Sequence, residues 1–172
     1  MVASPPRFER STVTESKRTE PAEHRAAPKP AGAPSGGRPA YSSDGGQTFT
    51  QVVLFTDTDG RARFREQAIA LPEGTPSSML SALMPSGGLQ LRHSPVGFRS
   101  SFHVTTTPQW VFILSGRMEI NLQDGSSRVF GPGQHFYSDD TLPAGATFDA
   151  SVHGHWSRQL GDDPLVTAFV RT

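Results

Sequence analysis

The sequence predicts an all-β fold for residues 48–172. Short runs rich in β-branched and aromatic residues follow one another closely, and turn-forming residues separate them. No long segment repeats apolar residues with the period of a helix. About ten strands are expected here, and that number favours two packed sheets, as in a jelly roll or sandwich, over one open sheet.

Residues 1–47 differ in composition from the rest of the chain. They hold seven of the fifteen prolines, five of the 17 glycines and only two aromatic residues, Phe8 and Tyr41. Such a segment buries too little apolar surface to offset the entropy lost on ordering. We therefore expect a disordered, Pro/Gly/Ser-rich tail before a single folded domain, residues 48–172.

Turn residues divide the first half of the domain. The expected strands are residues 51–57, 62–71, 78–84, 89–93 and 98–104. The breaks between them are Thr58-Asp59-Gly60, Pro72-Glu73-Gly74, Pro85 with Gly87-Gly88, and Pro95 with Gly97.

The second half contains the most apolar run, residues 110–114, which we expect to be covered on both faces. In residues 118–122, Met118, Ile120 and Leu122 alternate with polar residues, as in a half-buried strand. The remaining expected strands are residues 127–130 after an Asp124-Gly125 hairpin turn, 134–138, a strand within 148–160, and 165–170.

Residues 97–116 carry a spaced pattern of glycine and potential ligand residues. Gly97 is followed after five residues by His103-Val104-Thr105, after three more by Gln109, and after a further six by Gly116. This spacing resembles the first motif of the cupin superfamily, in which His-x-His and a Glu stand between two glycines. Here Thr105 replaces the second histidine and Gln109 replaces the glutamate.

The resemblance extends over residues 54–170, to a group of small single-domain cupins. The matching segments are Leu80-Ser81-Ala82-Leu83-Met84-Pro85, Pro108-Gln109, Phe130-Gly131-Pro132-Gly133, Asp139-Asp140-Thr141 and Gly154-His155-Trp156-Ser157-Arg158. It implies a cupin-type jelly-roll β-barrel that forms homodimers. Residues 142–153 are an insertion relative to the group, and we expect them to affect access to the barrel.

The resemblance also implies a site in the barrel. The expected ligands of a divalent metal (Fe, Mn, Ni, Cu or Zn) are His103, Gln109, Asp140 and His155, and the expected catalytic residues are His103, Gln109, His155 and Arg158. A histidine in a barrel is often simply hydrogen-bonded, and Asp-Asp-Thr is often a polar turn. His153 shares a strand face with His155, but we expect it to be exposed beside the insertion.

These features favour a small metalloenzyme that acts on a small organic molecule, as an isomerase or cyclase, a lyase or a dioxygenase. The alternatives are a non-catalytic binding or sensing protein with a degenerate metal site, and a structural homodimer subunit. The tail and the domain have net charges near zero and no dense basic patch, so no nucleic-acid partner is expected. We also expect no membrane partner and a cytoplasmic location. Lysine is absent after Lys29, which excludes Schiff-base catalysis by the domain.

Overall fold

The computed structural model describes residues 48–172, and the predicted disordered tail, residues 1–47, lies outside the described residues. Eleven strands and no helix form in this range, so the all-β prediction is confirmed. The described residues accordingly contain no apolar helix of membrane-spanning length.

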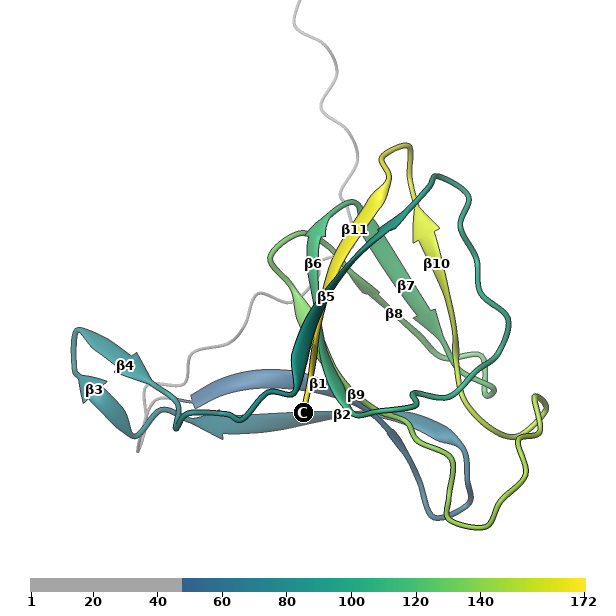
Figure 1. Cartoon of the computed structure of the whole chain (residues 1–172), viewed down its shortest axis with the longest axis horizontal. Coiled ribbons are helices and arrows are strands. Elements are labelled where there is room, and N and C mark those ends of the chain that lie inside the picture. The colour runs from purple at the N-terminus through teal and green to yellow at the C-terminus, as the bar shows by residue number, and fades with distance from the viewer. Residues whose placement is uncertain (1–47) are drawn as a thin grey trace, which may run out of the picture. The chain divides into compact units, whose positions relative to one another are not determined.

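Two sheets face each other, and a short hairpin lies apart from them (Figure 1). In order across the large sheet the strands are β2 (Ala62–Ala70), β1 (Thr48–Thr56), β9 (His135–Asp139), β6 (Gln109–Ser115), β11 (Leu165–Arg171) and β5 (Gly88–Ser94). The small sheet contains β10 (Trp156–Leu160), β7 (Arg117–Asn121) and β8 (Ser127–Phe130), and the hairpin contains β3 (Glu73–Thr75) and β4 (Ser78–Leu80). Many neighbouring strands are distant in the chain, as in a jelly roll; β1 and β9 run parallel and the other pairs are antiparallel.

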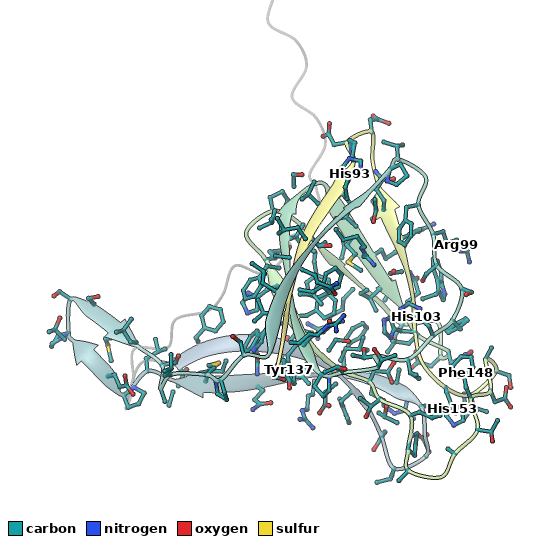
Figure 2. All side chains as sticks on the ribbon, in the orientation of Figure 1. His93, Arg99, His103, Tyr137, Phe148 and His153 are labelled. Atoms are coloured by element: carbon teal, nitrogen blue, oxygen red, sulfur yellow. The ribbon has the colours of Figure 1, made fainter. Side chains whose placement is uncertain are left out.

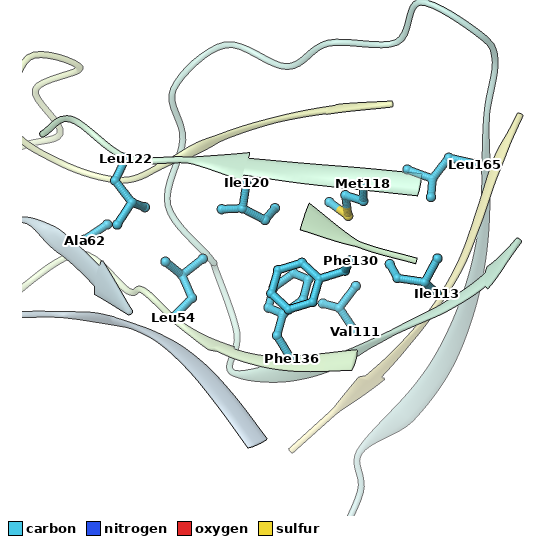
Figure 3. Close-up of a cluster of buried hydrophobic side chains, with 10 residues drawn as sticks. All are labelled: Leu54, Ala62, Val111, Ile113, Met118, Ile120, Leu122, Phe130, Phe136 and Leu165. Carbon is cyan, nitrogen blue, oxygen red and sulfur yellow. The ribbon is translucent and has the colours of Figure 1, made fainter. Parts of the chain in front are cut away.

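The hydrophobic core fills part of the space between these sheets (Figure 3). Met118 and Ile120 on β7 are buried, as their alternation with polar residues predicts. They belong to one cluster with Leu54, Val111 and Phe136 of the large sheet. Burial of one face of each sheet thus holds the two sheets together.

The expectation that residues 110–114 are covered on both faces is wrong. Val111 and Ile113 of β6 are buried, but Phe112 is 36% exposed and Leu114 is 52% exposed. The inner face of β6 contacts the core, whereas no further layer among the described residues covers the outer face.

Three expected strands are shorter than predicted. Of residues 78–84 only β4 is extended, and it pairs with β3 in a segment that we expected to be only a turn. Residues 98–104 form no regular strand and contribute isolated bridges, from Arg99 to Arg158 and from His103 to His155. In residues 148–160, β10 begins only at Trp156 because turns occupy the insertion.

Candidate functional site

Backbone pairing brings His103 and His155 together. The backbone N–H of each donates to the backbone carbonyl oxygen of the other, with both N···O distances 2.9 Å. The centroids of the two imidazole rings lie 4.5 Å apart. Gly154 permits this close approach: its φ is +81°, and a Cβ there would lie 2.2 Å from the carbonyl oxygen of His103. The glycine before His155 is therefore required by both its backbone conformation and its packing.

His155 forms a buried pair with Asp140. Nδ1 of His155 lies 2.8 Å from Oδ2 of Asp140, whose other carboxylate oxygen accepts a hydrogen bond of 2.8 Å from the Thr56 hydroxyl. Asp140 is fully buried and His155 is 5% exposed. Because an ionised carboxylate only accepts hydrogen bonds, Nδ1 of His155 is the donor, and in this tautomer Nε2 carries the lone pair.

His103 is held in a similar way by a backbone carbonyl. Its Nδ1 lies 2.9 Å from the carbonyl oxygen of Ser101, so Nδ1 is the donor and Nε2 again keeps the lone pair. Burial lowers the pKa of His103, and the positive charge of Arg92 lowers it further. His103 is therefore a neutral imidazole near pH 7.

Both rings line a cavity of about 220 Å³ between the sheets. Its other lining residues are Arg92, Val104, Thr105, Thr106, Gln109, Val111, Met118, Phe136, Ser138, Ser157 and Phe169. Some of these residues belong to the hydrophobic core, so the lining of the cavity combines apolar and polar side chains. No residue of the 142–153 insertion lines it.

The structure gives Thr105 a role that differs from that of the histidine expected at this position. Its side chain is buried, and its hydroxyl lies 2.6 Å from the hydroxyl of Ser138. Its backbone N–H donates to the carbonyl oxygen of Asp140 over 2.7 Å. Thr105 thus helps to position Asp140.

The predicted site residues fall into three places. His103, Gln109 and His155 line the cavity together. Asp140 lies behind His155, with both carboxylate oxygens in hydrogen bonds. Arg158 is on the other face of β10, where it pairs with Glu119 and lies over the ring of Trp156, and it does not line the cavity.

His93 and His153 lie apart from His103 (Figure 2). His153 accepts a hydrogen bond at Nδ1 from the N–H of Asp149 and lies near Phe148, within the insertion. His135 stacks on Phe49, with ring centroids 4.9 Å apart, on the outer face of the large sheet. A groove of about 430 Å³ on that face is lined mainly by apolar side chains, with His135 as its one titratable residue. The cavity lining includes Arg92, His103 and His155, so the cavity is the better candidate for chemistry.

Sequence reasoning missed Arg92, which enters the cavity from β5. The strand Leu89, Gln90, Leu91, Arg92 has an alternating pattern whose apolar residues suggest the core face. The structure reverses this assignment: Leu89 is 64% and Leu91 is 69% exposed. The only sequence signal would have been the charge of Arg92 itself, on the face of the strand opposite Leu89 and Leu91.

The residues present supply part of a metal site. Among residues 48–172 there is no group of three or more His, Cys, Asp or Glu side chains arranged to hold an ion. The candidate donors are Nε2 of His103, Nε2 of His155 and the amide oxygen of Gln109. Two imidazoles held by hydrogen bonds at Nδ1 suit a transition metal, because such bonds orient metal-binding histidines.

Solved structures that are similar to this chain include two cupin proteins. A cupin-like protein from Thermotoga maritima is 13% identical with a TM-score of 0.37, and the match covers 79% of this chain and 78% of that one. The cupin domain of Schizosaccharomyces pombe Cnp3 is 13% identical with a TM-score of 0.35, and the match covers 73% and 84%. No protein-family model and no curated protein matches the chain. These similarities are low, and the functional proposals below rest on the chain's own residues.

Proposed function

We propose that this protein is an enzyme that transfers a proton on a small organic molecule bound in the cavity, as in isomerase, cyclase or lyase reactions. The buried pair of Asp140 and His155 carries this proposal. Its Nδ1···Oδ2 distance of 2.8 Å fixes the ring, and the rest of the ring lines the cavity. A carboxylate-oriented imidazole is a common general base.

The pair works through the two nitrogens of one ring. Nε2 of His155 accepts a proton from the substrate, and the positive charge that develops on the imidazole is stabilised by the adjacent carboxylate of Asp140. The same nitrogen then returns the proton to another atom of the substrate. Neutral His103 and the amide of Gln109 provide hydrogen-bonding groups that orient the substrate.

A second candidate is a metalloenzyme. It is favoured by the hydrogen bonds that hold Nδ1 of both histidines and leave Nε2 of each without a hydrogen bond to any other residue in the range 48–172. His103, Gln109 and His155 would hold a divalent Fe, Mn, Ni, Cu or Zn ion. Such an ion supplies Lewis-acid or oxygen-activating chemistry, which adds a dioxygenase to the possible activities. Asp140 would orient His155 and not bind the ion itself.

One set of variants tests both candidates. The full chain, purified without a histidine tag, is incubated in D₂O with a panel of small carbonyl and hydroxy compounds, and exchange at carbon is followed by NMR. Bound metals are measured in the same preparations. His155→Ala is the test variant, and His93→Ala, which removes an exposed histidine, is the matched control.

Proton transfer predicts exchange by the metal-free wild type and by His93→Ala, and none by folded His155→Ala. Stoichiometric metal that is lost in His155→Ala, with exchange only in the metal-loaded protein, would favour the metalloenzyme. Ligand binding without exchange under either condition would contradict both and favour a non-catalytic binding protein.

A further inference from the structure

Arg92 lines the cavity without a carboxylate partner. Its guanidinium carbon lies 4.8 Å from the ring centroid of Phe169 and 5.3 Å from that of Phe98. Nε and Nη2 are buried and have no hydrogen-bond partner. The aromatic rings contact the guanidinium, but they provide no acceptor for these N–H groups.

No carboxylate is positioned to pair with this arginine. The cavity lining contains neither Asp nor Glu, and Asp140 already accepts hydrogen bonds from His155 and Thr56. Elsewhere in residues 48–172, Arg63, Arg128 and Arg158 each pair with a carboxylate at the surface. Arg92 is instead partly buried, and desolvation lowers its pKa.

A second unsatisfied group lies beside Arg92. Thr167 on β11 is its direct partner across the antiparallel pair of β11 and β5, so the two side chains share a face of the sheet. The hydroxyl of Thr167 is fully buried and has no hydrogen-bond partner. Thr167 does not line the cavity, whereas Arg92 does. Buried polar groups are normally hydrogen-bonded, so the unpaired N–H groups of Arg92 beside a cavity indicate a missing ligand.

We propose that the cavity binds a small molecule that carries a carboxylate, which pairs with the guanidinium of Arg92. The planar guanidinium carries paired N–H donors, and a carboxylate matches the spacing of such a pair. This assignment rests on the proposed function, because it names the substrate class of the same site.

The size of the cavity restricts this class further. At about 220 Å³ it is smaller than the roughly 300–1,000 Å³ typical of sites for drug-sized ligands. A short-chain mono- or dicarboxylate fits this limit. With its carboxylate at Arg92, such a molecule shares the cavity with His103 and His155, where proton transfer is proposed.

Binding to the full-length protein is measured by calorimetry with matched probes that differ in charge. These are propionate against propionamide and succinate against succinamide, with inorganic phosphate and sulfate as other anions. The variants are Arg92→Gln and Arg92→Lys, and the control is Arg117→Gln, which changes an exposed arginine of β7. Thermal melting with and without each probe reports folding.

We expect the carboxylates to bind and the amides not to bind. Arg92→Gln should weaken carboxylate binding about tenfold or more, since a charged bidentate contact is lost, and Arg92→Lys should restore it only in part. Arg117→Gln should leave it unchanged. Without ligand, Arg92→Gln should melt at the same temperature as wild type or higher, because it removes an unpaired buried charge.

Equal binding of carboxylates and amides, or unchanged carboxylate binding by folded Arg92→Gln, would overturn the proposal. Tighter binding of phosphate or sulfate than of any carboxylate would overturn the assignment to carboxylates. The proposed chemistry fails separately: carboxylate binding that needs Arg92, in a protein that exchanges no carbon-bound proton in D₂O, supports the binding site and contradicts only the acid–base role of His155.

Discussion

Two substitutions of Asp140 distinguish the contribution of its hydrogen bonds from that of its charge. Asp140→Ala leaves Nδ1 of His155 without a partner in the interior. Thr56 keeps an acceptor, because its hydroxyl oxygen also lies 2.7 Å from the carbonyl oxygen of Thr141, to which its single proton can turn. Asp140→Asn retains the shape: its amide oxygen can accept from His155, and its amide nitrogen can donate to the Thr56 hydroxyl.

The expected losses of stability follow from these contacts. Hydrogen bonds to a charged group contribute about 1.5–3 kcal/mol each, and relief of the desolvated carboxylate offsets part of the loss in either variant. We therefore expect Asp140→Ala to lower the free energy of unfolding by about 3 kcal/mol and Asp140→Asn by about 1 kcal/mol. At about 4 °C per kcal/mol for a domain of this size, Tm should fall by about 12 °C and about 4 °C.

Urea unfolding at pH 7, followed by circular dichroism, measures these free energies. The same variants in the D₂O exchange assay report the charge, because Asp140→Asn keeps the imidazole in place but removes the group that stabilises the protonated ring. A loss of less than 1 kcal/mol in Asp140→Ala, or a larger loss in Asp140→Asn than in Asp140→Ala, would refute a structural role for the Asp140 to His155 hydrogen bond.

Three further predictions concern pH, the glycine before His155 and oligomeric state. Burial lowers the folded-state pKa of His103 and His135 below the reference value of 6.5, so the folded protein binds fewer protons than the unfolded chain. The free energy of unfolding, measured in urea, should therefore be constant above pH 6.5 and fall below it. A rise in this free energy on acidification would contradict the prediction. Gly154→Ala should unfold the domain or lower its stability by about 3 kcal/mol or more, because the added Cβ would overlap the backbone. Gly97→Ala, at similar φ but in open space, should cost only about 1–2 kcal/mol. Equal Tm values for the two variants would refute the packing argument. Homodimerisation stays a prediction, and Leu91→Glu on the exposed edge strand should shift the mass measured by light scattering from dimer to monomer; a monomeric wild type would exclude it.

Local sequence patterns predicted most of the strands because the period of two and the turn residues are properties of short segments. Met118 and Ile120 of β7 are buried as expected. The pattern failed for β6, where Phe112 and Leu114 are apolar but exposed, because a strand does not specify whether a second layer covers its outer face. It failed again for β5, whose leucines are outside and whose arginine is inside.

The sequence by itself determined the all-β class. It also predicted that His103, Gln109 and His155 lie together, because the spacing of a motif can be recognised without knowing which residues are in contact. Only the tertiary structure decided the role of each group. It placed Asp140 behind His155, left Arg158 at the surface and brought Arg92 into the cavity. The physical reason is that the partner of a buried polar group comes from strand pairing between distant segments, which residue spacing within one segment does not encode.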